Sequence, residues 1–203
     1  MAAPMTRRSF LKYLFLISLS QYIRPTRLFA ESSDGTILLR PPGSLTEEDL
    51  AITCIRCGIC QKSCPSQCLK PAPIQAGLSI WKTPIIIPRK AGCIRCLTCS
   101  KVCPSGAILT PPMEEIKMGT AVIHRERCLV WTHQKECLVC KEYCPVAAIR
   151  TDARYRPIVE RTKCVGCGLC EQNCPVLEKR AAIEVFPQGE KRHFLPEKTY
   201  RSI

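Results

Sequence analysis

The sequence is poor in the large side chains that usually fill a protein core. Aromatic residues make up 6% of its 203 residues. After residue 23 no apolar run approaches the roughly 20 residues that a membrane-spanning helix needs. We find no Gly-rich nucleotide loop, no HExxH motif and no Ser/His/Asp set. These absences predict a protein without substrate chemistry of its own, and something besides aromatic packing must hold its core together.

Cysteine is abundant instead, with 17 residues. That usage is far above the level of an ordinary globular protein and approaches that of small disulfide scaffolds. Either cross-links or bound metal must therefore replace part of a conventional core. The odd number of cysteines argues against a set of disulfides that pairs every one of them.

The cysteines form four copies of one repeat, and each copy ends in Cys-Pro. Three copies have the spacing Cys-x2-Cys-x2-Cys-x3-Cys-Pro, and the third copy is stretched to Cys-x8-Cys-x2-Cys-x3-Cys-Pro. The copies are Cys54, Cys57, Cys60 and Cys64; Cys93, Cys96, Cys99 and Cys103; Cys128, Cys137, Cys140 and Cys144; and Cys164, Cys167, Cys170 and Cys174.

This spacing is typical of bacterial ferredoxins, in which three thiolates line a loop around a cluster and the fourth binds the cluster of a partner motif. A disulfide scaffold would not be expected to repeat this run four times. Structural zinc prefers paired Cys-x2-Cys sets closed as a tetrahedron, which three cysteines in a row plus one fit badly. We therefore expect four [4Fe–4S] clusters, with all sixteen motif cysteines as iron ligands.

The segments around the motifs predict the fold class. A short helix is expected to begin at each fourth cysteine, because proline suits the first helical position. Alternating β-branched residues predict strands over Thr120–His124, Arg156–Glu160 and Ala182–Phe186. The expected class is α+β: two ferredoxin-like modules of two clusters each, built from short helices and small antiparallel sheets.

Two features do not fit the repeat. Cys68 stands where two sister copies have Ala107 and Ala148, so we expect a small buried residue rather than a ligand or redox thiol. The insert of the third motif, residues 129–136, contains Trp131 and His133. His133 is expected to lie on a surface loop; for Trp131, a surface position and a role in shielding a cluster both remain open.

The N-terminus carries the twin-arginine pattern Thr6-Arg7-Arg8-Ser9-Phe10-Leu11-Lys12. This pattern, followed by a short apolar stretch, marks export of a folded protein. We therefore expect residues 1–30 to be a twin-arginine signal read by that export machinery. The expected location is the periplasm, as a soluble protein or one held at the inner membrane.

The rest of the chain divides by composition. Residues 31–53 form a polar, Pro-rich extension, in which Thr46 is expected to cap a short helix over Leu45–Ile52. Residues 54–186 hold the four motifs, and residues 187–203 are expected to form a flexible basic tail.

The formal charge of +13 resembles that of a nucleic-acid-binding protein. However, residues 1–30 hold five basic and no acidic residues, so the remaining 25 basic residues outnumber the 17 acidic ones by eight. Four oxidised clusters with their thiolates would each add a charge of about −2. The basic residues are therefore expected to offset cluster charge, and no nucleic-acid partner is expected.

With these motifs in view, the chain resembles the ferredoxin-type proteins of the MauM/NapG family. The resemblance covers nearly the whole chain and rests on the twin-arginine pattern, Arg40-Pro41-Pro42-Gly43, the CIRCGIC run at residues 54–60, residues 118–122 (MGTAV) and the stretched third motif. It implies an electron relay from a membrane quinol-oxidising, NapH-like polyferredoxin to a periplasmic redox enzyme, of the nitrate reductase or methylamine-utilisation type. The alternative is a maturation or assembly factor for a periplasmic dehydrogenase.

The pairing of the motifs is a separate question. Shorter connections favour adjacent pairing, but the difference in loop-closure entropy is only about 0.6 kcal/mol per doubling of length. The long Pro-rich connection between motifs one and two, and a plausible strand pair of Ile108–Leu109 with Ala121–Ile123, favour the nested pairing that related four-cluster subunits use. We therefore expect motif one to pair with four and motif two with three.

Overall fold

The computed structural model describes residues 38–133, 135–176 and 180–195. The twin-arginine pattern and the rest of the expected signal lie outside the described residues. Within the part of the chain that is described, no helix is both long enough and apolar enough to cross a membrane.

The elements are short, and they confirm the α+β class. Two 3-10 turns, η2 and η3, lie in the connections on either side of the second motif. The helices are α2 (Glu47–Thr53), α3 (Ile59–Lys62), α4 (Thr98–Lys101), α5 (Val139–Glu142) and α6 (Leu169–Gln172); the turns are η2 (Ile74–Ala76) and η3 (Met113–Glu115); the strands are β1 (Leu69–Pro71), β2 (Pro84–Ile86), β3 (Thr120–Ile123), β4 (Ile149–Thr151), β5 (Pro157–Val159) and β6 (Ile183–Phe186).

Helix α2 forms where the capping signal predicts it. The Thr46 hydroxyl accepts a hydrogen bond from the Asp49 backbone N–H, and three acidic residues occupy the first turn. Leu50 is the buried residue of this helix.

The helices inside the motifs were predicted one turn too late. Helices α3 to α6 each contain the third cysteine of a motif and end before the fourth, instead of beginning at it. The physical reason is the proline that follows the fourth cysteine, because a residue before proline is disfavoured in the helical region. The fourth cysteine therefore leaves the helix and is followed by a turn.

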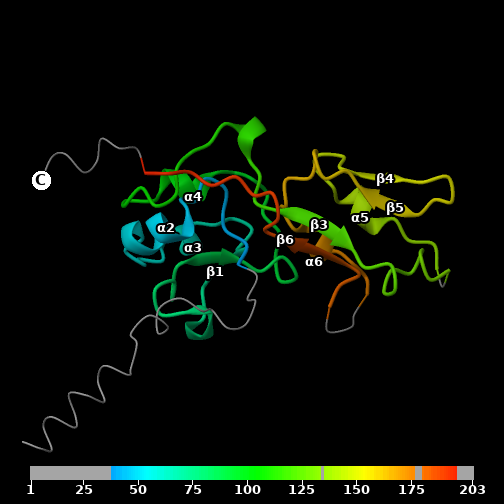
Figure 1. The fold of residues 1–203 in the computed structure, drawn as a ribbon, viewed down its shortest axis with the longest axis horizontal. Helices are drawn as coiled ribbons and strands as arrows, with labels where there is room; N and C mark the ends of the chain where they lie inside the picture. Colours follow the sequence, from blue (N-terminus) through cyan, green and yellow to red (C-terminus); the bar gives the residue numbers. More distant parts are fainter. Residues whose placement is uncertain (1–37, 134, 177–179, 196–203) are drawn as a thin grey trace, which may run out of the picture. The chain divides into compact units, whose positions relative to one another are not determined.

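In the described part of the chain, three two-stranded antiparallel sheets connect the motifs (Figure 1). Strands β1 and β2 pair Leu69 with Ile86 between motifs one and two, and β4 and β5 pair Ile149 with Val159 between motifs three and four. Strands β3 and β6, which precede motif three and follow motif four, pair Ala121 with Val185. All three predicted strands are present, each slightly shorter than expected.

The expected pairing of Ile108–Leu109 with Ala121–Ile123 is wrong. Ile108 forms a bridge with Ser44 instead, and Leu109 N–H donates to the Gly43 carbonyl at 2.8 Å. Strand β3 pairs with β6 instead, in the half of the molecule that contains motifs three and four.

The Arg40–Gly43 segment anchors the chain ahead of the first motif. The Arg40 side chain is 1% exposed and donates to the Glu47 carboxylate, to Thr83 Oγ1 at 2.8 Å and to the Pro84 carbonyl at 3.0 Å. It thereby ties α2 to the start of β2. The motif that suggested the family has a structural role in this protein.

The end of the chain differs from the expected flexible tail. Residues 187–195 return from β6 to the first half of the molecule and run toward α2 (Figure 1). Thr46 N–H donates to the His193 carbonyl at 3.0 Å, and His193 N–H donates to the Ser44 carbonyl at 3.2 Å. Backbone hydrogen bonding of this kind does not need side-chain periodicity, which explains why the segment looked structureless. Residues 196–203 lie outside the described residues.

Candidate metal centres

The sixteen motif cysteines gather into four groups of four, and each group lines one small cavity. We name each site by the motif that supplies three of its cysteines. Site I has Cys54, Cys57, Cys60 and Cys103; site II has Cys93, Cys96, Cys99 and Cys64; site III has Cys128, Cys137, Cys140 and Cys174; site IV has Cys164, Cys167, Cys170 and Cys144.

The expected nested pairing of motifs is therefore wrong. Cys103 joins the cysteines of motif one, and Cys174 joins those of motif three, so the pairs are one with two and three with four. The connection between motifs one and two, which looked too long for a hairpin, folds as one. Ala72 N–H donates to Thr83 O at 2.8 Å and Lys82 N–H to Ala72 O at 3.0 Å, while η2 takes up the extra residues. The long connection therefore does not separate the two motifs.

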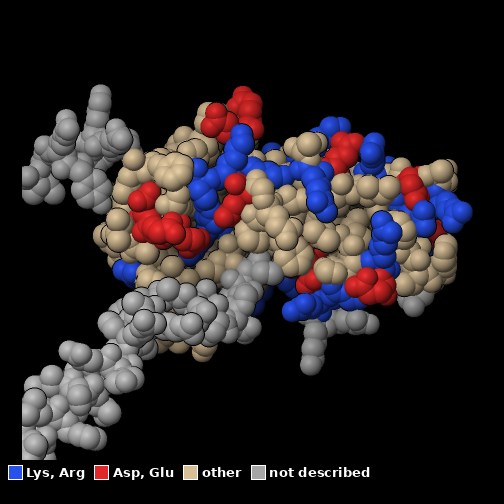
Figure 2. Space-filling view, in the orientation of Figure 1, with Lys and Arg blue, Asp and Glu red and all other residues tan. Residues whose placement is uncertain are grey.

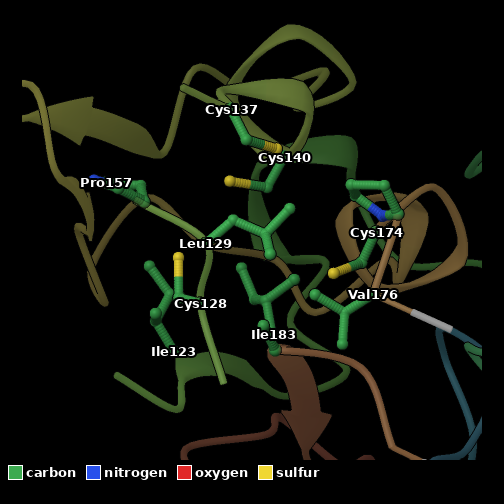
Figure 3. A pocket seen from close by; sticks show the side chains of 11 residues that line it. Ile123, Cys128, Leu129, Cys137, Cys140, Pro157, Cys174, Val176 and Ile183 are labelled. Carbon is green, nitrogen blue, oxygen red and sulfur yellow. The ribbon is translucent and has the colours of Figure 1, made fainter. Parts of the chain in front are cut away.

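Site III shows how a site is built. Figure 3 shows the Cys128, Cys140 and Cys174 side chains around a shared space. The apolar side chains of Ile123, Leu129, Val176 and Ile183 line the same cavity. Within the described residues, no three His, Cys, Asp or Glu side chains converge closely enough to hold a single ion. The four cysteines line one cavity together with these apolar side chains, which suits a cuboidal cluster held from several sides.

Burial and mutual repulsion oppose ionisation of the thiols in these groups. Burial, together with neighbouring cysteines, raises the pKa of Cys60 to about 11 and that of Cys99 and Cys140 to about 12. Four thiolates in such a cavity require a positive countercharge. Bound metal supplies that charge and thereby favours loss of the thiol protons. The donor set and its surroundings therefore fit an iron–sulfur cluster.

The backbone around the second cysteine has a shape that spacing alone did not predict. The residues on either side of it adopt a left-handed conformation in motifs one, two and four. Gly168 suits this conformation, but Leu97 adopts it too, so conformation rather than lack of space is the shared requirement. The pairs are Arg56 and Gly58, Arg95 and Leu97, and Gly166 and Gly168. Successive turns of this kind direct backbone N–H groups toward negative charge.

Several backbone N–H groups already point at ligand sulfurs. Ala148 N–H donates to Cys144 Sγ at 3.2 Å, and Arg95 and Ala121 donate to Cys93 Sγ and Cys164 Sγ at 3.4 Å. Hydrogen bonds to thiolates stabilise their charge and help to set the potential of the group that they hold.

Cys68 is buried, as its alignment with Ala107 and Ala148 predicts. What the alignment did not predict is its neighbour: Cys68 Sγ lies 3.6 Å from Cys64 Sγ and lines the cavity of site II. A hydrogen bond to Cys93 and burial raise the pKa of the Cys68 thiol, which favours the neutral form.

The two residues singled out in the insert of the third motif, Trp131 and His133, have different surroundings. His133 is exposed, in agreement with a surface loop. The Trp131 ring lies between the Arg125 and Arg156 guanidinium groups, at 4.3 and 4.1 Å. Its indole N–H donates to the carbonyl of Pro157, a residue that lines site III. Trp131 therefore packs behind a wall of this site.

Three sequence models of iron–sulfur domains match the chain. A 4Fe–4S dicluster domain matches residues 53–108, which is the first pair of motifs. A second dicluster model matches residues 92–148, and a 4Fe–4S binding domain matches residues 157–177. The second match spans motifs two and three, whose cysteines the structure does not bring into one site, because sequence spacing does not record which motifs pair.

Curated relatives agree on the family. The chain is 36% identical over 181 residues to the methylamine utilization ferredoxin-type protein MauM of Methylobacillus flagellatus, covering 79% of this chain and 73% of the relative. It is 38% identical over 178 residues to the ferredoxin-type protein NapG of Escherichia coli, covering 77% and 75%. It is 35% identical over 164 residues to MauM of Methylorubrum extorquens, covering 74% and 73%. The chain belongs to the MauM/NapG family of ferredoxin-type proteins and is a [4Fe–4S] electron-transfer protein.

Proposed function

We propose that this protein is an exported electron relay that takes electrons from a membrane quinol dehydrogenase and delivers them to a periplasmic redox enzyme. The observation that carries the proposal is the arrangement of the four cysteine sites in one unbroken series, from site I through sites II and IV to site III. A carrier with two ends needs such a series, whereas a single-site ferredoxin does not.

Contacts between consecutive sites support this order. Cys60 of site I is close enough to raise the pKa of Cys99 in site II, and Cys140 of site III does the same to Cys170 of site IV. Sites II and IV meet where Cys93 N–H donates to the Cys167 carbonyl at 2.7 Å. Sites I and III are therefore the two ends of the series.

The sixteen motif cysteines are proposed as the ligands of four [4Fe–4S] clusters, which supply one-electron redox chemistry when bound. The chain holds each site in an apolar wall, directs backbone N–H groups at its sulfurs and fixes the neighbouring sites against each other. Such a chain acts as a carrier, with no substrate chemistry of its own.

The proposed location rests on the sequence. The twin-arginine pattern at Arg7 and Arg8 is a signal for export of folded proteins, which permits cofactor insertion before export. The proposed terminal enzyme rests on the names of the relatives, which point to methylamine utilization and to the Nap system. The proposed partners are thus a NapH-like membrane polyferredoxin and a periplasmic enzyme of one of these two types.

A deletion strain tests the relay directly. Without this protein, the periplasmic enzyme should keep its activity with an artificial electron donor but lose activity that depends on the quinol pool. If activity is also lost with the artificial donor, the enzyme was never completed, and the chain is a maturation factor instead. Replacing both Arg7 and Arg8 by Lys should reproduce the deletion and leave the precursor in the cytoplasm.

A further inference from the structure

The first two motifs contain the same four residues, Cys-Ile-Arg-Cys, but their arginines have different surroundings. Both Arg56 and Arg95 adopt left-handed backbone conformations. The exposed Arg56 side chain donates to the carbonyls of Trp81 at 3.0 Å and Ser79 at 2.7 Å. Its role is to hold the β1–β2 connection, at the outer side of site I.

Arg95 lies instead where the two halves of the molecule meet. Two residues before it, Cys93 donates to the Cys167 carbonyl, and Gly92 packs so tightly on Leu169 that an added Cβ would lie 2.8 Å from its backbone nitrogen. The Arg95 Nε atom is buried and has no hydrogen-bond partner among the described residues. A buried guanidinium nitrogen without a partner is costly unless a negative group lies near it.

Arg95 lies between the first two ligands of site II, and its backbone N–H donates to Cys93 Sγ at 3.4 Å. The Arg95 guanidinium is close enough to Cys167 of site IV to act on its charge by Coulomb attraction. Motif four cannot supply such a charge itself, because the equivalent residue is Gly166, whose added Cβ would lie 2.4 Å from the Gly119 nitrogen. The charge therefore reaches site IV from the other half of the molecule.

We propose that Arg95 sets the redox potential at the junction of sites II and IV, by holding a positive charge that stabilises their reduced state. This role rests on the proposed electron relay. Reduction adds one electron to a site, with no bond made or broken and no proton moved, so the site becomes more negative by one charge. A fixed cation at the junction favours that state and makes these sites easier to reduce.

The test is a redox titration of the full cluster-loaded protein, with dithionite as the reductant and the paramagnetic signals of reduced clusters as the readout. In Arg95→Gln, one or two of the four reduction steps should shift to more negative potential by about 59 mV, a tenfold change in a one-electron equilibrium. Arg56→Gln removes the same side chain from the sister motif. Arg56 is exposed, so solvent screens its charge, and the steps should shift much less than in Arg95→Gln. Arg95→Lys keeps the charge and should stay close to the wild-type potentials.

Equal titrations of Arg95→Gln and Arg56→Gln would overturn the proposal, and so would a shift in Arg95→Lys as large as in Arg95→Gln. Iron content is measured for each variant. If Arg95→Gln loses iron, the Lys variant still decides the matter, because a full negative shift with its charge retained contradicts the proposal. The titration involves no partner protein, so its failure is distinguishable from failure of the relay itself.

Discussion

Cys68 is the one cysteine outside the four motifs, and its contact with Cys64 makes it the residue whose role most needs a test. Cys68→Ala should leave the iron content unchanged, because Ala107 and Ala148 occupy this position in the sister copies. Iron and sulfide analysis of the anaerobically purified variant measures this. A loss of about four irons, one cluster's worth, would make Cys68 a ligand.

Arg40 offers a second test at this scale. Arg40→Ala removes a buried side chain together with its bonds to Glu47, Thr83 and Pro84, and should cost about 2–4 kcal/mol. At constant heating rate, the loss of iron–sulfur absorbance should begin on the order of 10 °C lower. Arg150→Ala removes a side chain that is 67% exposed and pairs with Glu160 on the surface, and it should shift this temperature little. Equal shifts in the two variants would contradict the anchoring role.

Residue identities were predictable where chemistry is local. The spacing of the cysteines marks them as candidate ligands, because three cysteines of each motif must line one loop around a cluster. The different surroundings of Arg56 and Arg95 were not predictable. Both lie in the same Cys-Ile-Arg-Cys sequence, and tertiary contacts such as that of Gly92 with Leu169 separate them.

Among the elements, the turn at Gly43 has the strictest geometric requirement. Gly43 has a φ of +81°, and an added Cβ would lie 1.9 Å from the Leu109 carbonyl oxygen. Gly43→Ala should therefore break the bridge between this segment and Ile108 and lower the temperature of cluster loss. Left-handed strain alone costs about 1–2 kcal/mol, and the clash adds about 1–3 kcal/mol.

Gly106→Ala is the matched control for Gly43→Ala. Gly106 also has a positive φ, of +70°, but nothing lies within 4 Å of its added Cβ. The equivalent residues Gln67 and Ala147 adopt the same conformation with side chains. The control should be destabilised at most by the left-handed backbone strain. An effect as large as that of Gly43→Ala would show that the clash is unimportant.

Elements were predicted well where a signal lies within a few residues, as with Thr46 and helix α2. Strand positions were also predicted, but partners were not: β3 pairs with β6 about 60 residues away, and nothing in the sequence of β3 excludes Ile108 as a partner. The pairing of motifs failed for the same reason, because composition made the connection after β1 look like a linker when it is a hairpin.

At the scale of the whole molecule, residues 187–195 connect the two halves. Removing residues 190–203 deletes the Arg192 contact with Glu47 and the backbone bonds of His193. This truncation should lower the temperature of cluster loss, whereas removing only residues 196–203 leaves these contacts in place and should not. Parallel thermal scans of the two truncations test this, and identical scans would show that the return segment contributes nothing to stability.

The charge of the molecule follows from its cofactors. Figure 2 shows Lys and Arg interspersed with Asp and Glu on the visible face. With four clusters of about −2 each, the excess of eight basic residues after residue 30 is offset. The basic composition is therefore a counterpart of the bound metal.

The sixteen motif cysteines are expected to hold four [4Fe–4S] clusters. Iron and acid-labile sulfide analysis of the anaerobically purified full chain tests this most directly. The result predicted is about sixteen irons and about sixteen sulfides per chain, four of each for every cluster. Stoichiometric zinc, or thiols quantitatively paired as disulfides, would contradict it.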